Sequence, residues 1–377
     1  MKIADLRLTA FRYRTTTVRD YEGHPHIGDE HWATNRLLTI VADNGAEGHF
    51  VSGGCTPELV EGLLKPALLG EDPFFREMLH QRMQRIAKLT SLGEAAIAQV
   101  DNALWDLAGR HLGIPVYKML GASRTKVLAY ASTMPGDDTP GGLSTIEEYC
   151  DFARKLVAQG YQAIKLHTWM PPVVEADVKR EAALCAGVRE AVGPDIDLML
   201  DAHHHYDRQE ALYLAKECQR LGYVWIEEPM NETRLASYIW LAGKLDDLAI
   251  CGPENSEGGV LSRVQWAERG ATDMLRAAAG SGGITQMMKT IHLAEAYGLR
   301  MEVHGGGPDN MHALCAMGIN GKYYERGLVH PLRDFEVPFA WQKSHYDPLD
   351  SDGYVHVPDR PGLGDDIDFE FIAENAV

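Results

Sequence analysis

From residue 126 onward, short apolar runs alternate with longer amphipathic stretches, and this alternation limits the fold more than any other feature of the chain. The apolar runs predict strands, at residues 127–132, 163–167, 198–203, 224–228, 249–254, 274–277, 300–304 and 323–325. The amphipathic stretches predict helices, among them residues 146–159, 178–191, 208–221 and 286–297. Strands that alternate with helices form right-handed βαβ units around a parallel sheet. Eight such strands within about 200 residues predict a closed (β/α)8 barrel of the TIM type.

An open, doubly wound sheet is the rival architecture. No GxGxxG motif follows a first strand, so a dinucleotide-binding version of that sheet has little support. The 377 residues also exceed what one hydrophobic core holds, which indicates a second unit beside the barrel.

The residues before the barrel predict a smaller α+β unit. Residues 36–42 are strand-like, the turn signal Asp43-Asn44-Gly45 follows, and residues 56–121 contain three helical stretches. We therefore expect an N-terminal α+β capping domain over residues 1–125 and the barrel domain over residues 126–345. Residues 346–377 are rich in Asp, Pro and Gly, and we expect this short segment to pack back on the capping domain.

The composition excludes two classes of partner. The chain has 54 acidic and 36 basic residues, for a net charge of −18, whereas nucleic-acid binders concentrate Lys and Arg. It has no run of about 18 apolar residues that would span a membrane, and the charged start lacks a signal-peptide core. Its scattered cysteines show no CxxC spacing, which indicates reduced thiols and a cytoplasmic protein. The six cysteines are Cys55, Cys150, Cys185, Cys218, Cys251 and Cys315.

Ionisable residues lie at the ends of six of the eight predicted strands. In a closed barrel these carboxyl ends share one face, where active sites are built from residues of different strands. The residues in question are Lys165, His167, Asp201, His203, Glu227, Glu228, Glu254, His304 and Glu325. The sequence therefore predicts an active site at this face of the barrel.

Three of these groups are carboxylates from successive strands: Asp201, Glu227 and Glu254. Like charges raise one another's pKa, so three converging carboxylates need a cation to stay ionised together. Hard oxygen ligands on rigid elements favour Mg²⁺. The alternative is that each acid is a structural salt-bridge partner of a neighbouring basic residue. Period-two alternation turns Glu228 towards the barrel wall, where a structural role is expected.

Nitrogen bases would surround such a metal site. A cation disfavours the ammonium form of Lys165, which would lower its pKa and make it usable as a base. His167 and His304 are further candidate bases, whereas His203 is a candidate for substrate binding. The alternative for each histidine is a packing role. The adjacent His204 and His205 are assigned no function, because alternation places His204 outward and His205 in a loop.

These residues, in this order, resemble the enolase superfamily, and within it the mandelate racemase subgroup that includes sugar-acid dehydratases. The motifs are AIKLH at 163–167, LMLDAH at 198–203, WIEEP at 225–229, GPENSEGG at 252–259, GSGGIT at 280–285, MEVHGGG at 301–307 and YYERG at 323–327. The resemblance implies a modified, enolase-like barrel with a capping domain. It implies that Asp201, Glu227 and Glu254 bind Mg²⁺, and it gives catalytic roles to Lys165, His167, His304 and Glu325.

Two departures from the family pattern concern the bases. His167 occupies a position where the racemase has a lysine, which makes racemisation on that pattern less favoured. Ala277 occupies the position of the aspartate that usually orients the seventh-strand histidine, so His304 needs another partner, for which Asp309 is the candidate. The neighbouring Arg276 is expected to meet a substrate carboxylate or hydroxyl, with a structural salt bridge as the equal alternative.

The implied chemistry is the dehydration of an acid sugar. Mg²⁺ would chelate a carboxylate and an α-hydroxyl while His167 or Lys165 removes the α-proton. His304 would protonate the departing β-hydroxyl, and Glu325, if protonated, would hydrogen-bond the carboxylate. The product is a 2-keto-3-deoxy acid. A loop that resembles the family's specificity loop would close the site, and from it His31 is a candidate substrate-binding residue; the loop contains Tyr21, His24, His26, His31 and Trp32.

Three other functions compete with this hydro-lyase assignment. A racemase or epimerase of a 2-hydroxy acid would use the same ene-diolate with His167 and His304 on its two faces. An inactive barrel could act as a binding protein, although no metal carboxylate is lost. A metal-dependent hydrolase would need histidines at the end of the first strand, which has none. We expect a small sugar acid as substrate, an aldonate or aldarate such as lyxonate or galactarate, within carbohydrate catabolism. We also expect a homo-oligomer, from dimer to octamer.

Overall fold

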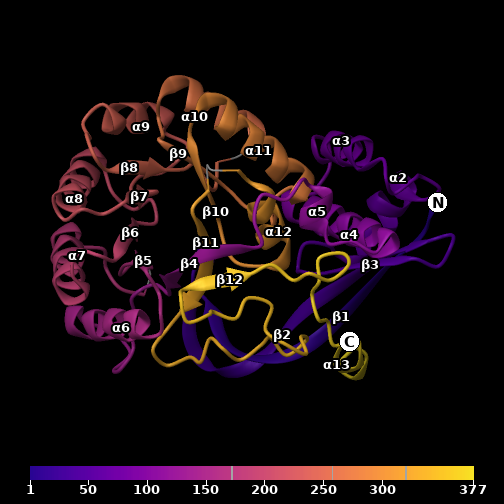
Figure 1. Ribbon diagram of the computed structural model, residues 1–377, viewed down its shortest axis with the longest axis horizontal. Helices are drawn as coiled ribbons and strands as arrows, with labels where there is room; N and C mark the ends of the chain where they lie inside the picture. The colour runs from indigo at the N-terminus through magenta and orange to yellow at the C-terminus, as the bar shows by residue number, and fades with distance from the viewer. Residues whose placement is uncertain (171–172, 257, 319–320) are drawn as a thin grey trace.

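The computed structural model describes residues 1–170, 173–256, 258–318 and 321–377 of the chain. Eight parallel strands form the main sheet, with helices arranged as an arc around them (Figure 1). The strands are β4 (Lys126–Thr133), β5 (Ala163–His167), β6 (Asp197–Asp201), β7 (Trp225–Glu227), β8 (Ala249–Cys251), β9 (Met274–Ala277), β10 (Arg300–Val303) and β11 (Tyr323–Val329). The surrounding helices are α6 (Ile146–Ala158), α7 (Val178–Val192), α8 (Arg208–Arg220), α9 (Leu235–Ala242), α10 (Val260–Arg269), α11 (Gly283–Tyr297) and α12 (Pro308–Ala316).

The hydrogen-bonded order of the strands is β10-β9-β8-β7-β6-β5-β4-β11. The two outer strands of this order also meet, because the Glu302 carboxylate of β10 accepts hydrogen bonds from the backbone of Lys322 and Tyr323 at the start of β11. The predicted (β/α)8 architecture is confirmed. Two strands match their predicted ranges, whereas β6 ends at Asp201, two residues earlier than expected, and leaves His203 in the following loop.

Alternation along the strands separates two layers of side chains. The outward residues pack beneath the helices; they include Ile164, Leu166, Leu198, Leu200 and Ile226. The inward residues fill the barrel and include Tyr130, Ala163, Met199, Trp225, Ala249 and Tyr323. Because inward positions recur every second residue, the last inward positions of β5, β6 and β7 are Lys165 and His167, Asp201, and Glu227. The apolar filling thus ends directly below the polar site.

An antiparallel sheet of β1 (Ile3–Arg19), β2 (Pro25–Ala42) and β3 (Glu47–Val51) forms the N-terminal unit. Its helical part contains α1 (Pro57–Leu59), η1 (Val60–Leu64), α2 (Lys65–Leu68), α3 (Arg76–Ala87), α4 (Glu94–Leu112) and α5 (Val116–Met119). Helix α4 lies so close to β3 that a side chain at Gly48 would collide with the backbone oxygen of Ala103. A glycine is therefore required where the sheet meets this helix.

The β1–β2 hairpin is much longer than the sequence indicates. Only residues 36–42 were expected to form a strand, because most of the hairpin alternates charged and half-buried side chains rather than apolar ones. Its turn reaches the barrel, where the ring of His24 stacks on that of His203 at 5.1 Å between centroids. The Asp20 carboxylate shapes this turn by accepting hydrogen bonds from the backbone N–H groups of Glu22 and His24.

The C-terminal residues contact both parts of the molecule. Strand β12 (Tyr354–His356) pairs antiparallel with β4 of the barrel. The segment that ends in α13 (Phe369–Glu374) packs against the hairpin, in a cluster of Phe11, Leu37, Trp341, Ile367 and Ile372. Among the described residues, no helix has the length and apolar character needed to cross a membrane.

Candidate active site

Two buried cations lie at the top of the barrel interior, each surrounded by carboxylates. Lys165 Nζ lies 2.9 Å from Glu227 Oε2, 3.0 Å from Glu325 Oε1 and 3.3 Å from Asp201 Oδ2. The Arg276 guanidinium contacts Glu227, and lies 2.8 Å from Glu254 Oε2 and 2.7 Å from Glu325 Oε2. Two cations therefore face four carboxylates, which leaves an excess of two negative charges when all are ionised.

The pKa values of Glu227 and Glu254 reflect this excess of negative charge. Burial raises the pKa of Glu227 well above its usual value, although Arg276 and Lys165 oppose the effect. Glu227 Oε1 is buried and has no hydrogen bond of acceptable geometry among the described residues. Burial also acts to raise the pKa of Glu254, but His304, Arg276 and Lys165 outweigh it and hold that pKa at about 2. The cluster has more carboxylates than its own cations keep ionised.

These features fit a divalent cation. Asp201 and Glu227 end adjacent strands, and Glu254 follows the next one, so that three carboxylates from successive strands lie at the same end of the sheet. Oxygen donors are what Mg²⁺ requires, and a charge of two would balance the excess. The structure thus supports the predicted ligand set through its chemistry and charge.

Arg276 is fully buried and is not among the residues that line the pocket above the cluster. Its Nη1 also donates a hydrogen bond to the hydroxyl of Tyr130. The sequence left two interpretations of this residue open, substrate binding and a structural salt bridge. Its contacts with Glu227 and Glu325 favour the second.

Lys165 differs from its expectation. Burial and Arg276 act to lower its pKa, but Glu227 and Glu325 outweigh both, and the net pKa is raised well above the usual value. The expected lowering depends on a neighbouring metal cation, whereas the contacts of Lys165 here are carboxylates. Glu325 also differs: burial acts to raise its pKa, but Lys165 and Arg276 outweigh burial, and the pKa lies well below the usual value. Its Oε2 accepts a hydrogen bond from Gly305 N. The expectation of a protonated Glu325 concerns the site with metal and substrate bound, and it stays a prediction.

The three candidate histidines surround this cluster. His167 is buried, its Nε2 lies 3.1 Å from Asp201 Oδ2, and its Nδ1 has no hydrogen-bond partner among the described residues. His203 packs edge-on against His167, and burial lowers the pKa of His203 to about 3, which keeps it neutral. His304 is partly exposed, with Nε2 3.2 Å from Glu254 Oε1.

The expected orienter of His304 is engaged elsewhere. Asp309 Oδ2 accepts a hydrogen bond of 2.8 Å from Asn102 Nδ2. The carboxylate that contacts the His304 ring is Glu254, which follows the neighbouring strand β8. Glu254 thus takes the place of the aspartate that is usual at the position of Ala277. The prediction about Asp309 is wrong, because Asp309 is hydrogen-bonded to Asn102 of α4 and Glu254 contacts the His304 ring.

A pocket of about 840 Å³ opens above the cluster. Its lining includes the predicted residues His167, Asp201, His203, Glu254, His304 and Glu325, together with Arg19, Glu22, His24, His204, His205, Glu228 and Asn255. Glu228 was expected at the barrel wall, and this is wrong. Strand β7 ends at Glu227, and Glu228 adopts a positive φ of 42° that turns it into the pocket, where it accepts a hydrogen bond from Asn255 Nδ2.

The structure does not bring His31 to this pocket. His31 lies on β2 opposite Thr15, and its Nδ1 contacts the backbone oxygen of Asp29. Arg19 and Glu22 line the pocket instead, and neither was predicted from the sequence as a site residue. The turn signal Asp-x-x-Gly at residues 20–23 would have placed the hairpin tip near them.

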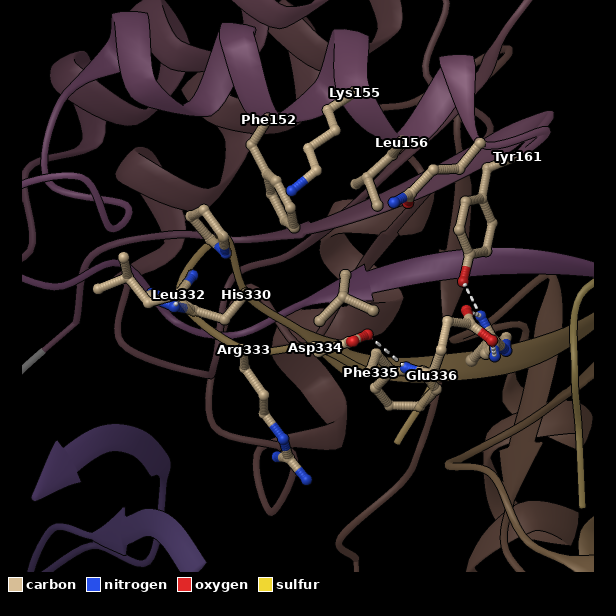
Figure 2. A pocket seen from close by; sticks show the side chains of 14 residues that line it. Phe152, Lys155, Leu156, Tyr161, His330, Leu332, Arg333, Asp334, Phe335 and Glu336 are labelled. Carbon is tan, nitrogen blue, oxygen red and sulfur yellow. Dashed lines mark hydrogen bonds and ion pairs between the residues drawn. The ribbon is translucent and has the colours of Figure 1, made fainter. Parts of the chain in front are cut away.

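A second pocket of about 470 Å³ lies between α6 and the chain that follows β11 (Figure 2). The Arg326 guanidinium in its lining donates hydrogen bonds to Tyr161 and Glu336. The two pockets share one wall, since Gly327 and Leu328 face the first and Val329 and His330 the second. None of the predicted site residues lines the second pocket, which leaves the first as the candidate active site.

Two family models match the chain. "Mandelate racemase / muconate lactonizing enzyme, N-terminal domain" matches residues 28–121, and "Enolase C-terminal domain-like" matches residues 148–371. The chain belongs to the enolase superfamily. The resemblance stated from the motifs is thereby confirmed.

Several members of the superfamily are similar to this chain over most of its length. The crystal structure of D-glucarate dehydratase from Agrobacterium tumefaciens, complexed with magnesium, is 48% identical, with a TM-score of 0.97, and the match covers 100% of this chain and 99% of that one. Arabinonate dehydratase of Saccharolobus solfataricus is 30% identical over 84% of this chain and 83% of its own. D-galactarolactone cycloisomerase of Agrobacterium fabrum is 30% identical over 81% of each.

Proposed function

We propose that this chain is a Mg²⁺-dependent acid-sugar dehydratase, a hydro-lyase that converts an aldonate or aldarate into a 2-keto-3-deoxy acid. One observation carries the proposal: candidate bases on opposite sides of the barrel flank a single group of carboxylates. Lys165 and His167 lie on β5, whereas His304 follows β10, on the far side of the strand order. The named relatives arabinonate dehydratase and D-glucarate dehydratase support the same class of reaction.

Asp201, Glu227 and Glu254 would hold the Mg²⁺, as the charge excess of the cluster supports. When bound, Mg²⁺ supplies positive charge that stabilises negative charge on the substrate carboxylate as the α-proton leaves. The similar structure of D-glucarate dehydratase is complexed with magnesium, which supports this cofactor.

The proton steps fall to the residues around the cluster. His167 or Lys165 removes the α-proton, and the pair is ordered by Asp201, which contacts both. His304 protonates the β-hydroxyl as it departs as water, and Glu254 orients its ring. The enol that remains then ketonises.

The pocket lining suits a polyhydroxylated anion. It is rich in histidine, asparagine and carboxylate groups that can bind hydroxyls, and Arg19 is the one Lys or Arg among its described lining residues. Within the described part of the chain the Arg19 guanidinium donates one hydrogen bond, to the backbone oxygen of Gly23, and it retains donors for a carboxylate at the distal end of a diacid. An aldarate uses this position, whereas an aldonate leaves it unpaired.

The proposal is tested by incubating the purified protein and Mg²⁺ with a panel of aldonates and aldarates. We expect at least one acid sugar to yield a 2-keto-3-deoxy product, detected by its reaction with semicarbazide or thiobarbituric acid. Solvent deuterium incorporation without loss of water would instead support the racemase or epimerase. Neither product nor exchange across the panel would contradict the proposal and favour a binding protein.

The His304→Asn variant should slow elimination of water more than exchange of the α-proton. The asparagine keeps a hydrogen bond near Glu254 but cannot donate the proton that the departing hydroxyl needs. We expect turnover to fall by about 100- to 10,000-fold, the usual contribution of a general acid. The measurement is product formation beside deuterium wash-in on the same substrate. An equal decrease in both rates would show that His304 is not simply the leaving-group acid.

The His167→Ala variant should suppress the exchange itself. Loss of the imidazole removes the base that lies 3.1 Å from Asp201, so wash-in of deuterium should fall by about 100-fold or more. A Lys165→Met variant, compared under the same conditions, separates the two candidates. Unchanged exchange in His167→Ala would move the base role to Lys165 alone.

We further propose a cytoplasmic, homo-oligomeric protein, between a dimer and an octamer. All six cysteines are free and buried, which is the usual state of thiols in a reducing compartment. Exposed apolar side chains on the N-terminal unit, Leu69, Phe75 and Leu89, support an interface between copies. Light scattering of the purified protein measures the oligomeric state, and a monomer would contradict this part.

A further inference from the structure

The tip of the β1–β2 hairpin and the loop after β6 bring a second group of metal-ligating side chains together, at the rim of the pocket. Glu22, His24 and His205 each offer a ligand atom, and these atoms all lie within 4.8 Å of one another. Two of the three come from the hairpin tip and one from the barrel. This group shares no residue with the proposed Mg²⁺ ligands.

The group has the orientation that metal-binding histidines usually have. Asp20 Oδ2 lies 3.1 Å from His24 Nδ1, which fixes the ring and leaves Nε2 free to bind. The same carboxylate lies 2.9 Å from Nε2 of the buried His26, so that Asp20 is itself held in place. A carboxylate behind a histidine ligand is a common second partner in zinc sites.

The barrel side contributes an unsatisfied ring nitrogen. His205 Nε2 is buried and has no hydrogen-bond partner among the described residues. Burial, followed by the influence of His204, lowers the pKa of His205, which keeps the imidazole in its neutral, metal-binding form. An unpaired buried nitrogen costs free energy unless some ligand meets it.

The backbone also holds this loop in an uncommon conformation. His203 and His204 both adopt positive φ values, 49° and 54°, which few residues other than glycine adopt. These two residues carry the chain from Asp201 at the end of β6 to His205 at the rim. The strain therefore lies directly between the proposed Mg²⁺ ligand and the rim group.

We propose that Glu22, His24 and His205 form a second metal site, for Zn²⁺ or a similar transition-metal ion, that fastens the hairpin tip to the barrel. Two imidazoles and one carboxylate suit Zn²⁺, whereas Mg²⁺ prefers oxygen ligands. The three protein ligands leave a fourth position for water or for a substrate oxygen. The site goes beyond the proposed dehydration and does not depend on it.

Such a site would close the pocket rim. His24 already stacks on His203 and lies 6.2 Å from His205 between ring centroids, so the metal would bind across an existing contact. Tyr21, 82% exposed, lies at the tip that the metal would hold. The metal would therefore reduce opening of the tip without moving any strand.

The test is Zn²⁺ binding to the full-length protein in excess Mg²⁺, measured by calorimetry and by the visible absorption of bound Co²⁺. We expect one site in the micromolar range or tighter. Asp20→Asn removes a partner of His24 but no ligand, and it should weaken Zn²⁺ binding by about 10- to 100-fold. His24→Gln and His205→Gln each remove a ligand and should weaken Zn²⁺ binding more than Asp20→Asn does. His31→Gln, on the same hairpin but outside the group, should bind like the unchanged protein. Affinity no tighter than millimolar, or unaltered binding in His24→Gln and His205→Gln, would overturn the proposal.

A second measurement reports on the tip itself. Cleavage after Tyr21 by chymotrypsin should slow on addition of Zn²⁺, by up to about 100-fold at 100 times the Kd, and His205→Gln should show no such protection. The Asp201→Asn variant separates this site from the proposed dehydratase site, because it should lose turnover and keep Zn²⁺ protection. The ligand atoms of His167, Asp201 and His203 also lie within 4.8 Å of one another. Loss of protection in Asp201→Asn would place the ion there and overturn the proposal.

Discussion

The Asp201→Asn variant should lose turnover by about 100- to 1,000-fold, since a metal that stabilises developing charge contributes several kcal/mol to the transition state. Asparagine keeps the shape of the side chain but removes one of the negative charges that would hold Mg²⁺. The loss should appear at saturating substrate and should not be recovered by moderate increases in Mg²⁺. The measurement is product formation as a function of Mg²⁺ concentration.

Folding should survive this change. Removing the charge of Asp201 loses its attraction to the neighbouring histidines and to Lys165, which outweighs burial and holds the Asp201 pKa well below its usual value. The change also relieves repulsion with Glu227, and Lys165 keeps two other carboxylate partners. The urea midpoint should therefore stay close to that of the unchanged protein. Asp207→Asn serves as the matched control, because Asp207 caps α8 in the same loop and asparagine caps equally well. Full activity in Asp201→Asn would refute the metal assignment.

The Arg276→Met variant should be the most destabilising single change at the site. Methionine fills much of the volume but leaves Glu227, Glu254 and Glu325 without the guanidinium that contacts all three. Removing one partner of a buried ion pair costs about 3–5 kcal/mol, a large share of a typical free energy of unfolding. The measurement is equilibrium urea unfolding in the presence and absence of Mg²⁺.

A matched variant and a ligand separate this effect from general damage. Arg276→Lys keeps the charge and should lose less stability than Arg276→Met, although it cannot reach three carboxylates at once. Added Mg²⁺ should restore part of the lost stability of Arg276→Met, because the ion neutralises the same carboxylates. If Arg276→Met unfolds like the unchanged protein and only its KM rises, the alternative role of Arg276 in substrate binding is the correct one.

The barrel and most of its polar rim follow from the sequence for one physical reason. Inward and outward positions alternate along a strand, so the apolar run that predicts β5 also determines that Lys165 and His167 face the same side. The parallel order of β5, β6 and β7 then brings His167, Asp201 and Glu227 level with one another. Where the backbone is regular, the sequence pattern therefore predicts which side chains meet at the site.

The alternation fails where the backbone stops being regular. Glu228 comes directly after the end of β7 and His203 two residues after the end of β6, and both adopt positive φ. Extending the strand pattern to them gave the wrong direction for Glu228 and the wrong element for His203. Arg276 was visible as a residue of β9, but its three carboxylate partners come from β7, from the loop after β8 and from β11. Such long-range pairing has no local signal. The charged β1–β2 hairpin likewise lacks the apolar run that predicts a strand.

The pocket contains two groups of residues, on the barrel strands and on the hairpin tip, that differ in how freely they can be substituted. The groups proposed to move protons are fixed to barrel strands that also bury the core, so changing them risks the fold. The residues from Arg19 to His24 lie at the hairpin tip, which meets the barrel through the ring contacts of His24 with His203, His204 and His205. Duplicated copies of this gene can therefore acquire new substrates by altering six consecutive codons while the reaction itself is retained.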